Sequence, residues 1–272
     1  MTAVEKQELA GFLDITDDFL SSGYRSAERE YRFEDDAVLA GKAAQAAAQA
    51  NSAQSNGVQV GGAQSGEQSN GAYGSGAQSG GDSIEKIAAE VRVCRNCPLA
   101  EKRTNAVPGE GVMQPLVMVI GEGPGADEDA QGRPFVGRAG QLLDKMLNAI
   151  NLSRKTNCFI ANVVKCRPPQ NREPYPEETA LCAHFLERQI AMLKPKFILC
   201  VGNVSARALL KTNERVGHLR GKFTDYAAGD LTIPLFVTYH PSALLHSDTY
   251  KRPAWEDLKL LRAKIEELYG GS

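Results

Sequence analysis

Short apolar runs alternate with helical patterns along the second half of the chain. The runs have the length of buried strands and lie at residues 116–120, 159–164, 197–201 and 235–239. Patterns with helical spacing follow them at residues 140–150, 177–193, 204–210 and 253–268. Four strand–helix units in succession predict a three-layer α/β/α fold with a central, mainly parallel four-stranded sheet. Because such sheets bind ligands where their strands end, we expect the site in the loops after these strands.

The first 82 residues lack this alternation. Residues 41–82 consist almost wholly of Gly, Ala, Gln, Ser and Asn, and they cannot bury enough apolar surface to offset the loss of chain entropy. We interpret them as a flexible linker, whose Ala- and Gln-rich start could extend a helix. Residues 1–40 are an acidic, partly helical extension, either a solvated tail or a segment that docks a protein partner. Residues 83–272 are then the folded domain.

Charge is distributed unevenly among these three parts. The chain holds 31 basic and 33 acidic residues, a net charge of −2. Residues 1–40 contribute ten acidic and four basic residues, whereas residues 83–272 contribute 21 acidic and 26 basic residues. The near-neutral sum therefore conceals a domain with a net charge of +5, which favours nucleic acid as a partner.

The chain shows no signal for a membrane or for export. No stretch of the sequence is apolar enough to span a bilayer, and the first residues are charged and lead into no apolar signal core. We therefore expect a cytoplasmic protein without a membrane partner, and a monomer.

Four of the six cysteines are spaced like metal ligands, namely Cys94, Cys97, Cys166 and Cys182. In a reducing compartment, a CxxC pair with a second pair further along the chain is typical of metal ligation and not of disulfides. The spacing alone does not separate zinc from an iron–sulfur cluster. Cys158 and Cys200 fall in or beside apolar runs, and we expect them in the core.

The loops after the predicted strands carry distinctive motifs. They read GEGPG at 121–125, GRPFVGRAGQLL at 132–143, NVVKCRPPQNR at 162–172 and HPS at 240–242. A dinucleotide-binding turn is an alternative for the first motif, but Pro124 and the acidic residues after it interrupt such a turn, and no helix is expected before about Gly140. Together with the cysteine spacing, the motifs resemble those of the family-four uracil-DNA glycosylases over about residues 94–268. The resemblance implies a DNA-repair enzyme that flips uracil out of DNA and hydrolyses its N-glycosidic bond.

Asn162 and His240 match the catalytic positions of that family. The Asn162 side chain both donates and accepts hydrogen bonds, which suits the mixed edge of uracil and rejects cytosine. His240 is implied to donate a hydrogen bond to uracil O2, and this bond strengthens as the breaking bond leaves negative charge on the ring. Phe135 is implied to stack on the flipped base, although a phenylalanine between Pro134 and Val136 would otherwise be expected in the core.

Other loop residues complete the implied substrate site. The backbone of Gly121, Glu122 and Gly123 would face the uracil carbonyls. Better-known uracil glycosylases carry Gln at the Glu122 position and a water-orienting Asp at the Gly123 position, so the water-positioning residue is unassigned. Glu128 would close the C5 position against the methyl group of thymine; the alternative is a solvated acid in a loop.

Two leucines and several basic residues are implied to contact the DNA itself. Leu244 and Leu245 resemble the wedge that fills the gap left by the flipped base, and this predicts that both are exposed. Phosphate contacts would come from nearby basic residues, namely Arg133, Arg138, Arg172, Lys251 and Arg252.

The resemblance also covers the metal site. It implies a [4Fe–4S] cluster on the four spaced cysteines, with a structural role in organising residues 166–182. The implied partner is uracil-containing DNA, single- or double-stranded. Residues 167–174 lack the His-containing insertion of the covalently trapping uracil-DNA binders, so turnover is expected. The alternative from another class is a non-catalytic, metal-stabilised nucleic-acid-binding module.

Overall fold

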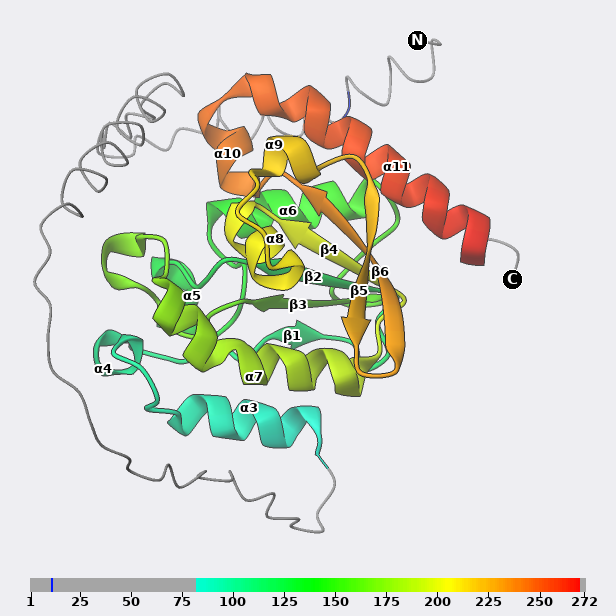
Figure 1. Ribbon diagram of the computed structural model, residues 1–272. Coiled ribbons are helices and arrows are strands. Elements are labelled where there is room, and N and C mark those ends of the chain that lie inside the picture. Colours follow the sequence, from blue (N-terminus) through cyan, green and yellow to red (C-terminus); the bar gives the residue numbers. More distant parts are fainter. Residues whose placement is uncertain (1–10, 12–81, 270–272) are drawn as a thin grey trace, which may run out of the picture. The chain divides into compact units, whose positions relative to one another are not determined.

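The computed structural model describes Gly11 and residues 82–269 (Figure 1). The predicted extension and linker therefore lie outside the described residues, apart from Gly11 and Asp82. No helix in the described ranges combines the length and apolar character needed to cross a membrane.

A six-stranded sheet forms the centre of the domain. Its strands are β1 (Glu110–Gly111), β2 (Val117–Gly121), β3 (Cys158–Asn162), β4 (Phe197–Val201), β5 (Phe223–Ala228) and β6 (Leu231–Thr238). They are arranged in the order β1-β3-β2-β4-β6-β5. The inner strands β3, β2, β4 and β6 pair in parallel, and β1 and β5 are added antiparallel at the two edges. The four predicted strands are confirmed, and the two edge strands were not predicted.

Helices cover both faces of the sheet and give the predicted three layers. Beyond the sheet lie α3 (Ile84–Val93), α4 (Leu99–Lys102), α5 (Ala126–Gln131), α6 (Arg138–Asn148), α7 (Pro176–Leu193), α8 (Asn203–Leu210), α9 (Val216–Leu219), α10 (Pro241–His246) and α11 (Lys251–Tyr269). In Figure 1, α3 and α7 lie on one side of the sheet, and α6, α10 and α11 on the other. Alternate residues of β2 divide in the same way. Met118 and Ile120 pack in the core between the sheet and α3 and α7, whereas Val117 and Val119 pack in the core between the sheet and α6 and α11.

The short helix α5 corrects the expectation that no helix begins before about Gly140. It has no apolar stripe, because its sequence is ADEDAQ. The acidic side chains lie in the first turn, where their negative charge interacts favourably with the positive end of the helix dipole. The Glu128 carboxylate also accepts a hydrogen bond from the Gly125 amide at 3.0 Å. This helix is therefore stabilised by capping at its N-terminus and not by an apolar face packed on the core.

Helix α3 is held against α7 by both packing and charge. Ile87 and Val91 are fully buried in the core between the helices and the sheet. Arg188 of α7 donates through Nη2 to Asp82 Oδ1 at 2.7 Å and also binds Glu90. Cys94 and Cys97 follow directly after α3, so these contacts also fix where the two cysteines lie against the core.

Candidate functional site

The ends of β2 and β3 bring three of the predicted residues together. Gly121 and Asn162 are the last residues of these strands and lie opposite each other in the sheet register. A Cβ atom on Gly121 would be 2.4 Å from Phe135 Cζ and 2.5 Å from Asn162 Oδ1. Any larger residue would displace both side chains, so Gly121 makes the space in which they meet.

The Asn162 side chain has an unusual environment. The residue is 1% exposed, and its Oδ1 atom is buried without a hydrogen-bond partner among the described residues. Its backbone carbonyl, in contrast, accepts from Lys165 Nζ at 2.8 Å. A buried acceptor without a donor costs roughly 1–3 kcal/mol, so this atom can accept a hydrogen bond from a donor that the described residues do not supply.

Phe135 forms one wall of the same site in a strained backbone conformation. Its φ angle is +52°, in the left-handed region that few residues other than glycine adopt. The residue is 6% exposed, and its ring centroid lies 5.7 Å from that of His240, with the rings tilted by 37°. The structure therefore brings Phe135 together with both predicted catalytic residues.

His240 begins helix α10 with its ring held in one orientation. Its Nδ1 atom accepts from the Ser242 amide at 3.2 Å and lies 2.7 Å from Ser242 Oγ. Because a backbone amide is a donor only, Nδ1 is the unprotonated nitrogen and Nε2 carries the proton. Burial lowers the pKa of His240 to about 4, against a smaller opposite effect of Glu128. At neutral pH the ring is thus an uncharged donor through Nε2.

Glu122 follows Gly121 in the loop after β2. Burial, with a further contribution from the Glu173 carboxylate, raises the pKa of Glu122 to about 7. Next to it, a Cβ atom on Gly123 would be 2.7 Å from Val164 Cγ2, so the loop packs directly on the segment after β3. The loop therefore places at the edge of the site an acid whose protonation changes near neutral pH.

Glu128 ties the two glycine-containing loops to each other. One carboxylate oxygen accepts from the amides of Val136 and Gly137, both at 2.8 Å, and the other accepts from the Gly125 amide. Glu128 is therefore no solvated loop acid. Its predicted role at the C5 position of the base stays a prediction.

The two leucines after the HPS motif have different positions. Leu244 is fully buried in the core beneath α6 and α11, whereas Leu245 is half-buried and packs at the edge of that core. The expectation that both are exposed is wrong for Leu244, because it falls on the buried side of α10 with Pro241. Leu245 alone is partly accessible to DNA.

Three of the basic residues suggested as phosphate contacts already form ion pairs, and Arg133 does so with the Glu110 carboxylate through Nε and Nη2. Lys251 is 1% exposed and pairs with Asp248, and Arg172 binds the Glu178 carboxylate through both terminal nitrogens. The suggestion is wrong for Lys251, because its ammonium group lies inside the domain.

The four spaced cysteines lie in one region as free thiols. Cys166 interacts electrostatically with Cys94 and Cys97, and Cys182 interacts with Cys166 and Cys97. Arg103 Nη1 donates to Cys166 Sγ at 2.9 Å. Within residues 82–269, however, no three His, Cys, Asp or Glu side chains are arranged closely enough to hold a metal ion. Cys158 and Cys200 are fully buried in the core, as predicted.

Lys165 and Ser242 are site residues that sequence reasoning missed. Lys165 has no role in the sequence analysis, yet it is fully buried and donates to Asn162 O at 2.8 Å and to Gln189 Oε1 at 2.7 Å. Ser242 orients His240. Lys165 lies in the NVVKC motif and Ser242 in the HPS motif, and this position was the one sequence feature that could have indicated a role in the site.

Comparisons with known proteins give matches to one superfamily. The family model of the uracil DNA glycosylase superfamily matches residues 108–259. The chain is 42% identical over 181 residues to a type-4 uracil-DNA glycosylase of Pyrobaculum aerophilum, which covers 65% of this chain and 92% of the relative. Relatives of the same name from Sulfurisphaera tokodaii and Thermotoga maritima are 43% and 41% identical, and the matches cover 66% and 68% of this chain and 84% and 95% of the relatives.

Proposed function

The chain belongs to the uracil DNA glycosylase superfamily and to its type-4 family, and from this membership we propose that it is a DNA-repair hydrolase that removes uracil from DNA. The enzyme binds a flipped uracil at the ends of β2 and β3, breaks the N-glycosidic bond and leaves an abasic site. The observation that carries this proposal is the buried, unpartnered Oδ1 atom of Asn162 beside the Phe135 ring.

Asn162 supplies the base selectivity in this proposal. The N3–H group of uracil is a donor and matches the unpartnered Oδ1 atom, while the side-chain amide donates to the neighbouring O4. Cytosine has an acceptor at N3 and an amino group at C4, so it would leave Asn162 unsatisfied. Phe135 stacks on the base that these hydrogen bonds hold.

His240 stabilises the departing base. As the bond between N1 and C1′ breaks, its electron pair passes into the uracil ring and negative charge develops at O2. The neutral imidazole donates its Nε2–H to that oxygen, in an orientation that Ser242 fixes through Nδ1. Water adds to C1′ and completes the hydrolysis.

The surrounding loops shape the pocket. Gly121, Glu122 and Gly123 present their backbone to the uracil carbonyls, and Glu128 holds the loop of Phe135 beside the C5 edge of the base. Leu245 enters the base stack as the wedge, and buried Leu244 supports it from below.

Cys94, Cys97, Cys166 and Cys182 hold a [4Fe–4S] cluster in this proposal, and an iron–sulfur cluster is typical of the type-4 family. The donor chemistry fits, because all four thiols are free and share one region, although in the described residues they are not arranged closely enough to hold a metal ion. Lys165 and Arg103 supply positive charge next to them, which suits thiolate ligands. Through these four ligands, a bound cluster would link the end of α3 to residues 166–182.

The remaining assignments concern partners and place. The enzyme acts as a cytoplasmic monomer on single- or double-stranded uracil-containing DNA, and residues 1–40 are either a solvated tail or a segment that docks a protein partner.

A labelled oligonucleotide with a single uracil tests the function directly. The full-length protein should convert it to an alkali-labile abasic product, and a cytosine-containing control should stay intact. Binding of the oligonucleotide without product would favour the non-catalytic module. The same preparation should be brown with broad absorption near ~400 nm, whereas a colourless, zinc-loaded protein would contradict the cluster.

A further inference from the structure

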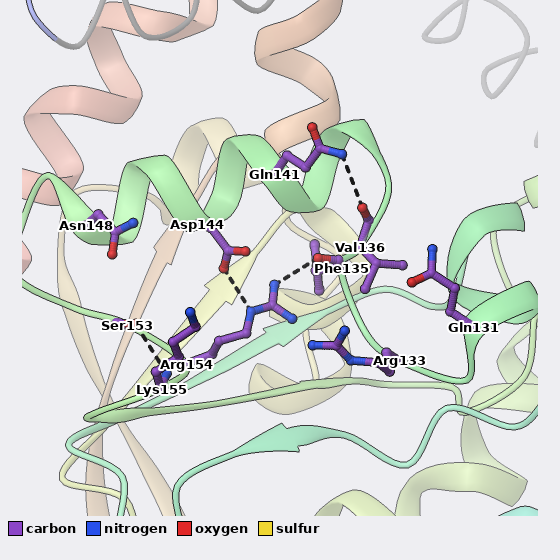
Figure 2. Close-up of a pocket in the computed structure, with 10 residues that line it drawn as sticks. All are labelled: Gln131, Arg133, Phe135, Val136, Gln141, Asp144, Asn148, Ser153, Arg154 and Lys155. Atoms are coloured by element: carbon purple, nitrogen blue, oxygen red, sulfur yellow. Dashed lines mark hydrogen bonds and ion pairs between the residues drawn. The ribbon is translucent and has the colours of Figure 1, made fainter.

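Arg154 lies in the turn between α6 and β3, outside every motif that the proposed function uses. Its side chain is 9% exposed. It lines a cavity of about 560 Å³ together with Phe135, Val136 and Asp144 (Figure 2). The cavity therefore borders the loop that carries the proposed stacking ring.

The Arg154 guanidinium binds that loop through its backbone. Nη1 donates to Pro134 O and Nη2 donates to Phe135 O, both at 2.8 Å, while Nε donates to Asp144 Oδ1 at 2.9 Å. Figure 2 shows Arg154 between Asp144 of α6 and the Phe135 loop. The planar Arg154 guanidinium thus fixes the consecutive carbonyls of Pro134 and Phe135, and the Asp144 carboxylate orients the guanidinium.

The Phe135 backbone requires such fixing. A residue other than glycine with φ near +52° is disfavoured and persists only where its surroundings impose it. Glu128 holds the amides of the two residues that follow, and a Cβ on Gly140 would lie 2.0 Å from the Phe135 carbonyl. Arg154 holds the carbonyls. The peptides on both sides of Phe135 are therefore bound by charged side chains.

We propose that Arg154, oriented by Asp144, is a positioning residue for uracil excision: it keeps Phe135 in its left-handed conformation and so keeps the ring against Gly121 and Asn162. The inference rests on the proposed function, because it assigns Phe135 to the base. Lysine cannot replace arginine here, since one ammonium group cannot donate in plane to two carbonyls and a carboxylate.

A double-mutant cycle tests whether Arg154 acts through Phe135. Arg154→Lys is made in the wild-type chain and in Phe135→Ala, and kcat/KM for uracil release is measured for all four proteins. Because hydrogen bonds to a charged group are each worth roughly tenfold, Arg154→Lys should lower kcat/KM about tenfold or more in the wild-type background. In the Phe135→Ala background the loss should be under about twofold, because the ring to be positioned is gone.

Equal losses in the two backgrounds would overturn the proposal, since they would mean that Arg154 matters to the protein without acting through Phe135. An unaffected Arg154→Lys single variant would overturn it as well. Lys155→Gln is the matched control: it changes the neighbouring residue on the same cavity, and its activity should stay at the wild-type level.

A second variant covers the possibility that Arg154→Lys does not fold. Asp144→Asn retains the guanidinium but removes the charge that orients it, and it should show the same dependence on Phe135 with a smaller loss. Thermal unfolding of every variant checks that each is folded at the assay temperature. A wild-type protein that releases no uracil would refute the proposed function itself, and this result is distinct from any outcome of the cycle.

Discussion

Among the described residues, a buried polar atom at the end of β3 has no partner, whereas both oxygens of a buried carboxylate at the end of β6 are paired. Asn162 Oδ1 is the unpartnered atom. At β6, the Asp257 carboxylate is 0% exposed and accepts from Thr238 Oγ1 at 2.7 Å and from Arg220 Nε and Nη2 at 2.9 and 2.7 Å. Both groups have been removed from water, but only the Asp257 side chain receives hydrogen bonds within the described domain, although burial still raises its pKa to about 6.

The difference separates a structural role from a binding role. A satisfied buried network fixes the elements that meet in it, here β6, α11 and the segment with Arg220. An unsatisfied group destabilises the fold and is retained for the ligand that pairs with it. The comparison therefore predicts that changes at Asp257 act on stability and that changes at Asn162 act on catalysis.

The largest effect is expected from Asp257→Ala. It leaves the Arg220 guanidinium without its carboxylate in a partly buried position, and removal of one partner of a buried pair costs about 3–5 kcal/mol. Urea unfolding should show this loss, while kcat/KM per folded molecule stays within a few-fold of wild type. A stable protein with lost activity would reverse the assigned roles.

Asn162→Ala should show the opposite pattern. Uracil release should fall by roughly 10²–10³-fold, because the base loses the group that reads its edge. The free energy of unfolding should change by no more than about 1 kcal/mol, since the substitution also removes an unsatisfied acceptor. Single-turnover uracil release and urea unfolding on the same preparation measure both. A destabilised but fully active variant would contradict the site.

His240 extends the comparison to pH. Its pKa in the folded protein is about 4, below the ordinary value of 6.5, so between these values the unfolded chain binds a proton that the folded protein does not. The contribution of His240 to stability should therefore fall as the pH drops from about 6.5 toward 4, whereas Glu122, whose pKa is raised to about 7, contributes in the opposite direction. From about pH 7 to pH 5 the contribution is roughly 2 kcal/mol. The difference in free energy of unfolding between wild type and His240→Asn, measured in urea at each pH, should change by this amount, and a difference that is independent of pH would place the titration elsewhere.

The smallest effect is expected from Thr238→Val. The substitution preserves shape and removes one of the hydrogen bonds to Asp257, while both Arg220 contacts remain. The free energy of unfolding should fall by about 1 kcal/mol, with unchanged uracil release. A loss as large as that of Asp257→Ala would show that the network depends on the hydroxyl and not on the ion pair.

The inner sheet could be predicted from sequence because burial on both faces makes each parallel strand a continuous apolar run. The edge strands could not. Residues Glu110–Gly111 are too short to form a pattern, and the side chains of Phe223–Ala228 are half-buried or exposed. Helix α5 has no apolar stripe, so a search for hydrophobic periodicity passes over it.

The site residues divide similarly. Asn162, Phe135 and His240 lie in recognised motifs, and the structure brings them together. Their supporting contacts depend on pairs far apart in sequence, such as Arg154 with the Phe135 carbonyl, and single charged residues carry no periodic signal. The predicted exposure of Leu244 was wrong because it rested on the position after the HPS motif, whereas Leu244 lies on the buried side of the short helix α10.

The contact between Arg188 and Asp82 bears on where the chain can be cut. Asp82 precedes the predicted domain boundary at residue 83, yet it accepts from Arg188 through both carboxylate oxygens. A fragment starting at Ser83 would lose that carboxylate. It would also place a new positively charged amino terminus at the N-cap of α3, where the helix dipole disfavours it. A protease-resistant core should therefore include Asp82, so that α3, which leads to Cys94, stays bound to α7.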